Sequence, residues 1–169
     1  GGIAGYIGDP SGAGWSNNNA GGTLTSCINE GALNIDNAYV ESIGGVVGMF
    51  RGGSLTGCES NGSFVIGATK ADSRLGGITG YIQNRSGKKL TISGCTNNAT
   101  INLTSAATTL SSIGGIVGMA HHQEFETEVS GCYNKGQISV SSTGNINVGG
   151  VVATYGASQT APFRFYDCH

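Results

Sequence analysis

The residues best suited to acid–base chemistry lie close together in the sequence, as His121, His122, Glu124, Glu126 and Glu128. In an extended segment the alternating glutamates would share one face, and two carboxyl groups about 5 to 10 Å apart can act as a general acid and a general base. No second acidic group recurs in the neighbouring segments to converge on them. We therefore interpret the cluster as a solvated loop whose charges keep an edge of the protein soluble.

Sequence motifs for the common catalytic chemistries are missing. The chain has no Gly-x-Ser-x-Gly, no His-Glu-x-x-His, no phosphate-loop lysine and no Asp-x-Asp spacing for calcium. We predict that the protein is not an enzyme, with no catalytic residue, no cofactor and no metal site.

A few aromatic and cationic side chains are the best candidates for ligand binding. Trp15 could stack on a sugar ring, although aromatic side chains more often pack against a core. Cationic side chains in the variable segments between the repeated blocks, where Trp15 also lies, could add polar contacts to a ligand. The candidate ligand-binding residues are Trp15, Arg51, Arg85, His121 and His122.

Five cysteines recur at intervals of 31 to 37 residues, at Cys27, Cys58, Cys95, Cys132 and Cys168. If these positions stack in layers about 4.8 Å apart, their parallel Cβ vectors are unfavourable for disulfides, and an odd number leaves one thiol unpaired. A straight column also lacks the tetrahedral convergence that zinc needs. We predict a structural ladder of buried free thiols, because cysteine behaves as a small hydrophobic residue.

The cysteines belong to a larger repeat with a period near 36 residues. A glycine-rich block precedes each cysteine segment, and a short apolar segment follows most of them, so each repeat holds three strand candidates. The glycine-rich blocks span residues 1–7, 44–50, 76–82, 114–120 and 149–155. One such unit cannot bury its own apolar face and must stack on its neighbours.

Composition excludes several other classes of protein. Glycine supplies 31 of 169 residues and charged residues only 11%, which disfavours long helices, and 2 prolines without a triplet period exclude collagen. A net charge of -2 offers no basic surface for nucleic acid, and no 18-residue apolar run could span a bilayer.

These observations predict an all-β fold, a single parallel β-solenoid domain over residues 1–169, with about five coils. We expect right-handed winding, because right-handed crossovers dominate between parallel strands. Two smaller coils per repeat remain an alternative to one coil of three strands. Variable loops should emerge along one edge, at residues 8–23, 51–54, 83–89, 121–128 and 156–164.

Stacking also gives meaning to columns of equivalent residues. Ile3, Val46, Ile78, Ile116 and Val151 should form a buried aliphatic column. Gly5, Gly48, Gly80 and Gly118, with Ala153 in the last repeat, indicate a steric limit. Asn29, Ser60, Asn97 and Asn134 should form a ladder at a corner, in left-handed turn geometry.

The blocks Gly2-Ile-Ala-Gly5, Gly45-Val-Val-Gly48, Gly77-Ile-Thr-Gly80 and Gly115-Ile-Val-Gly118 resemble the GLUG motif. That motif recurs in surface and secreted proteins of bacteria, including repeat regions of some IgA-cleaving metallopeptidases and adhesin-like proteins of gut anaerobes. The resemblance implies an extracellular location and a repeat character, and it carries no catalytic residues. In the fifth copy Ala153 replaces the last glycine.

We therefore expect a non-catalytic, extracellular, adhesin-like stalk or spacer that is a segment of a longer bacterial surface protein. The expected partners are host or bacterial glycans or surface proteins, and the rest of the parent chain or stacked protomers would cover the open ends. The alternative is a glycan-binding or glycan-cleaving β-helix that uses the variable-loop edge.

Overall fold

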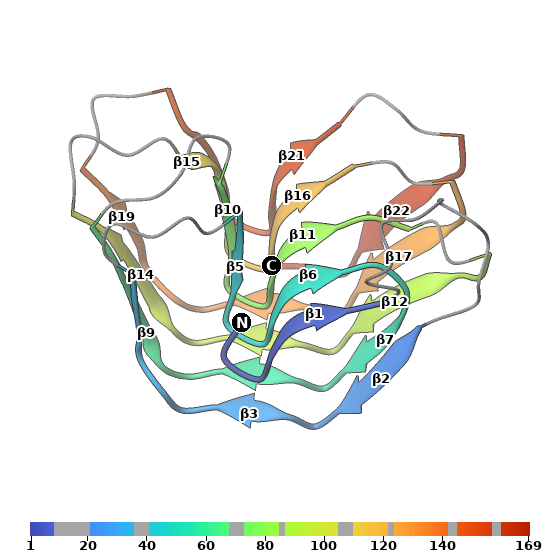
Figure 1. Cartoon of the computed structure of the whole chain (residues 1–169), viewed down its shortest axis with the longest axis horizontal. Helices are drawn as coiled ribbons and strands as arrows, with labels where there is room; N and C mark the ends of the chain where they lie inside the picture. The colour runs from blue at the N-terminus through green and yellow to red at the C-terminus, as the bar shows by residue number, and fades with distance from the viewer. Residues whose placement is uncertain are drawn as a thin grey trace.

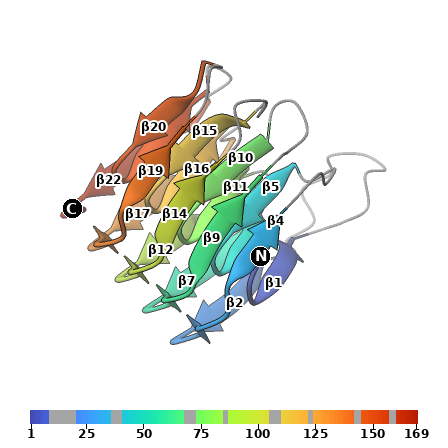
Figure 2. The same cartoon turned by 90° about the vertical axis from the view of Figure 1, so that its left-hand side faces the viewer.

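The computed structural model describes residues 1–8, 21–35, 41–67, 73–84, 87–104, 110–121, 124–141, 145–156 and 160–169. In these residues the chain forms short strands and no helix, and it winds through five successive coils. Figures 1 and 2 show the coils stacked in order from the N-terminus to the C-terminus, with equivalent strands lying side by side. The predicted parallel β-solenoid of about five coils is confirmed.

Equivalent strands of successive coils form five parallel sheets, numbered here in the order in which the chain meets them. Sheet 1 holds β1 (Ala4–Ile7), β6 (Val47–Phe50), β11 (Thr79–Ile82), β16 (Val117–Ala120) and β21 (Val152–Tyr155). Sheet 2 holds β2 (Gly22–Thr25), β7 (Gly53–Thr56), β12 (Leu90–Ser93), β17 (Thr127–Ser130) and β22 (Phe163–Tyr166). Sheet 3 holds β3 (Ile28–Asn29), β8 (Glu59–Ser60), β13 (Thr96–Asn97) and β18 (Tyr133–Asn134). Sheet 4 holds β4 (Leu33–Ile35), β9 (Ser63–Ile66), β14 (Thr100–Leu103) and β19 (Ile138–Val140), and sheet 5 holds β5 (Ser42–Gly44), β10 (Ser73–Gly76), β15 (Leu110–Gly114) and β20 (Asn147–Gly149).

Each of the first four repeats is therefore one coil with five strands rather than the three that the sequence predicts, and the described part of the fifth holds β21 and β22. Thr79 pairs with Val47 of the preceding coil and with Val117 of the following one, so equivalent positions lie one full repeat apart. This register excludes two smaller coils per repeat. The two additional strands lie in sheets 3 and 5. Sheet 3 strands have two residues and show no hydrophobic period, and sheet 5 strands have three to five residues and end on the first glycine of the glycine pair.

Each coil has two lobes (Figure 1). Sheets 1 and 2 enclose one lobe, whose core includes Val47, Phe50, Leu55 and Ile92. Sheets 4 and 5 enclose the other, whose core includes Phe64 and Leu75, and sheet 3 joins the two lobes. The chain turns inward at the glycine pair between sheets 5 and 1, and there the two walls of the coil meet at a waist.

The close approach of the chain at the waist explains why the second residue of each pair is glycine. A Cβ on Gly77 would lie within 3.0 Å of the Asn97 side chain and of the Gly115 carbonyl, and the same clash recurs at Gly115 with Asn134. The asparagine ladder thus faces inward, against the glycine pair. The predicted left-handed turn geometry at these asparagines is wrong, because Asn97 and Asn134 lie in sheet 3 strands.

Left-handed backbone occurs instead one residue before each cysteine. Gly57, Gly94 and Gly131 have φ near 60°, and Ser26 and Asp167 have a φ of 52°. Glycine adopts this conformation without steric cost, which accounts for its use in the three inner coils.

The steric limit predicted for the last glycine of each block is confirmed. A Cβ on Gly80 or Gly118 would come within 3.0 Å of backbone atoms in sheet 5, because sheets 5 and 1 approach closely there. Gly5, in the first coil, would meet nothing within 4 Å.

The aliphatic column is also confirmed, with one exception. Val46, Ile78 and Ile116 are fully buried and Val151 packs against the same core, while Ile3 in the first coil is 43% exposed.

Candidate functional site

The largest variation in length lies at the edge that joins sheet 1 to sheet 2. Its connections are residues 8–21, 51–52, 83–89, 121–126 and 156–162. The connections from sheet 4 to sheet 5, counted between register partners, vary only from six to eight residues, at 36–41, 67–73, 104–111 and 141–146. The predicted variable-loop edge therefore exists, and we refer to it by that name.

Two of the predicted ligand-binding residues lie on this edge in the described part of the chain. Arg51 directly follows β6 and His121 directly follows β16, and Gln83 occupies the equivalent place in the coil between them. Their backbone N–H groups continue the ladder, since Arg51 donates to Ile7 O at 2.9 Å and His121 donates to Ile82 O at 3.0 Å. Arg51 and His121 are thus held two coils apart, about 10 Å. Trp15, Arg85 and His122 lie outside the described residues.

Each of these two side chains contacts a tyrosine of sheet 1. The Arg51 guanidinium lies 5.4 Å from the centroid of the Tyr6 ring, and the Tyr81 hydroxyl lies 3.5 Å from His121 Nδ1. The arrangement places a cation and an imidazole in different coils, each beside a tyrosine.

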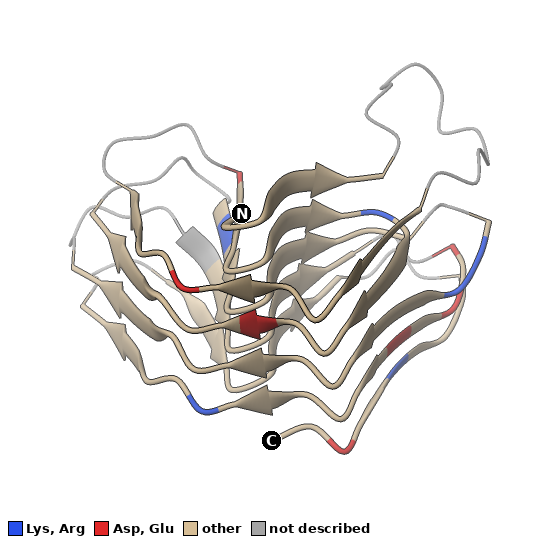
Figure 3. Cartoon of the chain, turned by 90° about the horizontal axis from the view of Figure 1, so that it is seen from below, with Lys and Arg blue, Asp and Glu red and all other residues tan. Residues whose placement is uncertain are grey.

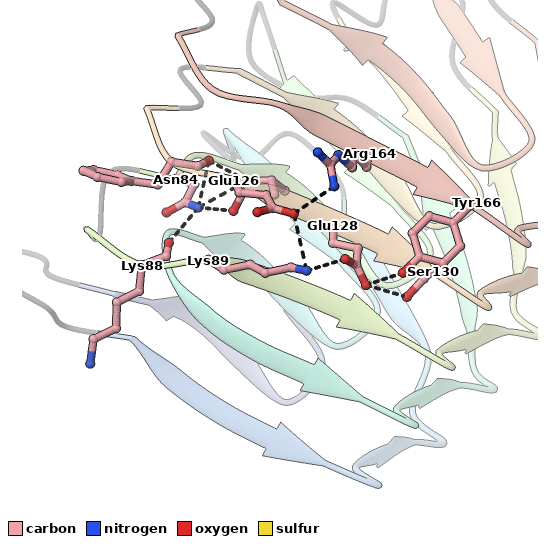
Figure 4. Close-up of polar contacts among 10 residues, drawn as sticks. Asn84, Lys88, Lys89, Glu126, Glu128, Ser130, Arg164 and Tyr166 are labelled. Carbon is pink, nitrogen blue, oxygen red and sulfur yellow. Dashed lines mark hydrogen bonds and ion pairs between the residues drawn. The ribbon is translucent and has the colours of Figure 1, made fainter.

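The acidic cluster runs from the variable-loop edge, which holds Glu124 and Glu126, onto sheet 2, which holds Glu128 (Figure 4). Lys89 forms ion pairs with Glu126 and Glu128, and Arg164 forms one with Glu126 at 3.5 Å. Glu128 also accepts hydrogen bonds from the Tyr166 hydroxyl at 2.6 Å and the Ser130 hydroxyl at 3.3 Å.

These contacts stabilise the charged forms of the acid and the base. The hydrogen bonds from Lys89 and Tyr166 lower the pKa of Glu128, and the hydrogen bond to Glu128 raises the pKa of Lys89. A general acid at neutral pH needs the opposite shift in a carboxyl group. The cluster therefore suits a solvated, ion-paired surface better than proton transfer.

A buried amide that the sequence analysis did not single out organises the neighbouring loops. The Asn84 side-chain nitrogen lies within hydrogen-bond distance, 2.9–3.3 Å, of Lys88 O, Phe125 O, Glu126 O and Thr127 Oγ1, which share its two N–H donors. The Asn84 backbone carbonyl accepts from Glu124 N at 2.9 Å. Asn84 thus joins two successive loops of the variable-loop edge, those that hold Lys88 and Glu126.

A second region that the sequence analysis did not single out lies where the outer faces of sheets 5 and 1 meet between the lobes. We call it the interlobe seam, and its side chains are Ser42, Arg74, Ser112 and Asn147 from sheet 5 and Met49, Tyr81, Met119 and Thr154 from sheet 1. The Arg74 guanidinium lies 4.7 Å from the Tyr81 ring centroid, and Arg74 Nε donates to Met119 Sδ at 3.2 Å. The one feature of the sequence that could have indicated this region is Arg74, a lone arginine in an otherwise uncharged strand.

The five cysteines stack as free thiols along the corner between sheets 2 and 3. Cys58, Cys95 and Cys132 are buried, and Cys27 and Cys168 are partly exposed. Each inner thiol donates to the carbonyl two residues earlier and to a carbonyl of the preceding coil, as Cys95 does to Ser93 O at 3.5 Å and Leu55 O at 3.7 Å. Burial raises the pKa of Cys58, which keeps this thiol protonated.

Charged residues are scattered over several sheets and loops rather than gathered in a patch of one sign (Figure 3). In the described ranges no three His, Cys, Asp or Glu side chains are placed to hold a metal ion. No helix in the same ranges is long and apolar enough to cross a membrane.

Comparisons of the chain with family models, curated proteins and solved structures find no match. The GLUG resemblance therefore stays a prediction.

Proposed function

We propose that this chain is a non-catalytic structural segment, a stalk or spacer, of an adhesin-like protein on the outside of a bacterial cell. The observation that carries the proposal is the unbroken register of sheets 1 and 2 through all five coils. Each coil rests on its neighbour through main-chain hydrogen bonds, and about 4.8 Å per coil gives a body on the order of 20 Å tall.

The polar groups where the variable-loop edge meets sheet 2 support the same proposal. The residues nearest to an acid–base pair, Glu126 and Glu128, are engaged with Lys89 and Arg164, and the pKa of Glu128 is lowered. An ion-paired surface of this kind is better suited to keeping the protein soluble than to catalysing proton transfer.

A screen of neutral and acidic oligosaccharides for hydrolysis and for binding tests the proposal. A stalk should release no sugar, and Trp15→Ala should leave any binding unchanged. Tyr133→Ala is the matched control, because Tyr133 is an exposed aromatic on sheet 3, away from the loop edge. Hydrolysis by the wild type that depends on a residue of the variable-loop edge would contradict the proposal. Binding that is lost in Trp15→Ala and kept in Tyr133→Ala would favour the glycan-binding alternative.

A further inference from the structure

Arg74 is a partly buried cation without a carboxylate partner in the described part of the chain. Its Nε donates to the thioether sulfur of Met119, and one face of its guanidinium covers the Tyr81 ring. A guanidinium carries five N–H donors, and a thioether is a weak acceptor. Its two terminal nitrogens therefore have donors to spare, in a place where water is partly excluded.

The neighbours of Arg74 in the sheet 5 ladder are also unsatisfied. Arg74 pairs in register with Ser42 and Ser112, and both serine hydroxyl oxygens are buried without a hydrogen-bond partner. Ser112 is only 1% exposed. A buried hydroxyl without a partner loses its hydration and gains nothing in return, so two of them beside one cation are unusual.

The pleat of the strands aims these groups to the same side. Leu75 and its register partners Ile43 and Ile113 are buried in the core of the second lobe. Because adjacent residues of a strand point to opposite faces, the preceding residues Ser42, Arg74 and Ser112 point into the interlobe seam. Three polar groups thus form a row with a spacing of about 4.8 Å, with the cation in the middle.

We propose that the interlobe seam at Arg74 binds the carboxylate of an acidic saccharide. A planar guanidinium matches a carboxylate with two parallel N–H···O bonds, and this pairing is strongest where water is partly excluded. The exposed seam groups are the Asn147 amide and the Thr154 hydroxyl that it contacts, and the His121 imidazole lies beside Tyr81; groups of this kind pair well with sugar hydroxyls.

This site is separate from the stalk role and from the Trp15 alternative, so its failure leaves both standing. The probes are D-glucuronate, D-glucose as the neutral match, and L-glutamate as a carboxylate on an amino acid. Isothermal titration calorimetry should show glucuronate binding roughly tenfold or more tightly than glucose and glutamate. Equal affinity for glucuronate and glucose would overturn the carboxylate site, and glutamate as tight as glucuronate would overturn the saccharide.

Substitutions locate the binding. Arg74→Gln should reduce glucuronate affinity to that for glucose, whereas Arg74→Lys should leave an intermediate affinity, because lysine keeps the charge and loses the planar fork. Arg164→Gln is the control, since Arg164 is an exposed arginine on sheet 2. Thermal melting verifies that each variant is folded. Full affinity in Arg74→Lys, or an equal loss in Arg164→Gln, would overturn the site even if Arg74→Gln failed to fold.

Discussion

At the waist of the coil, glycine has only a hydrogen atom as its side chain, and this allows the glycine pair to approach the asparagine side chains of sheet 3. Gly115 and Gly150 hold the same place in successive coils and differ only in what faces them. A Cβ on Gly115 would overlap Asn134 and the Gly150 carbonyl, and a Cβ on Gly150 would meet nothing within 4 Å.

We therefore expect opposite outcomes for Gly115→Ala and Gly150→Ala. Gly115→Ala should lower the free energy of unfolding by about 3 kcal/mol, because the clash involves backbone as well as a side chain held by hydrogen bonds. Gly150→Ala should be neutral within about 0.5 kcal/mol. Urea denaturation of both variants tests this comparison. Equal losses would show that backbone conformation, rather than the packing of the waist, selects glycine.

Ser60 interrupts the asparagine ladder and is the position where the ladder can be improved. Asn97 accepts from Ala99 N at 3.2 Å and donates to Asn134 Oδ1 at 2.8 Å, whereas the buried Ser60 hydroxyl has no partner. Ser60→Asn should make equivalent bonds and raise the free energy of unfolding by about 1 kcal/mol.

The matched control for this change is Ser60→Ala, which removes the unsatisfied hydroxyl and should be neutral or slightly stabilising. Urea denaturation measures both. A Ser60→Asn variant less stable than Ser60→Ala would contradict the proposed ladder.

At the scale of the strand and its corner, the thiol column adds a pH dependence to stability. Burial raises the pKa of Cys58, and a hydrogen bond with Cys132 together with burial raises the pKa of Cys95. The ordinary thiol pKa is 9.0. Below that pH these two thiols are neutral in both the folded and the unfolded chain, so the contribution of Cys58 and Cys95 to stability is fully present.

Above pH 9 the unfolded chain releases protons that the folded chain keeps, and stability must fall. We expect the urea midpoint to start decreasing near pH 9, before tyrosine and lysine titrate around pH 10. The Cys58→Ala, Cys95→Ala double variant should be less stable at pH 7 and should lose most of the decrease between pH 9 and 10. An unchanged slope in that variant would assign the decrease to other groups.

Sequence alone predicted those elements in which one residue type recurs at a fixed spacing. The cysteine, aliphatic and glycine columns gave the period, and the period gave the parallel stacking. The strands of sheets 3 and 5 were not predicted. Two residues in each sheet 3 strand show no period, and sheet 5 strands such as Ser42–Gly44 end on the first glycine of a pair that is typical of a turn.

The interlobe seam was not predicted from the sequence for a different reason. Arg74 and Tyr81 are close in sequence, yet their contact with Met119 requires the chain to fold back on itself at the waist. Columns of equivalent residues show which strands stack on one another, and they do not show that the outer faces of sheets 5 and 1 meet. Asn84 likewise looks like any polar loop residue until the loops of two coils are placed around it.

For the whole molecule, the two-lobed coil changes where a ligand can be held. A convex solenoid offers only its edges, whereas the inward turn at the glycine pairs brings the outer faces of sheets 1 and 5 together. The variable-loop edge, with ion pairs and differing loop lengths, can diverge without disturbing the register of the sheets.

The stacked architecture also predicts how stability is distributed along the axis. Each coil contacts only its neighbours, so coils two and three are supported on both sides in all five sheets, and the first and fifth coils are supported on one side. Coil four is supported on both sides only in sheets 1 and 2, since β18, β19 and β20 are edge strands. The difference is visible in burial, since all four residues of β11 are buried, whereas Phe165 and Tyr166 of β22 are 61% and 48% exposed.

Native-state hydrogen exchange followed by mass spectrometry should therefore show slowest exchange in β11 and β12 of the third coil. Protection should fall toward β2 and β22 at either end, by roughly tenfold or more, because the end coils open without unfolding the middle. Gly115→Ala weakens the fourth coil and should lower protection in β16 and β17 more than in β6 and β7. Uniform exchange across all five coils would instead mean that the solenoid unfolds as one cooperative unit, in which no coil opens before the others.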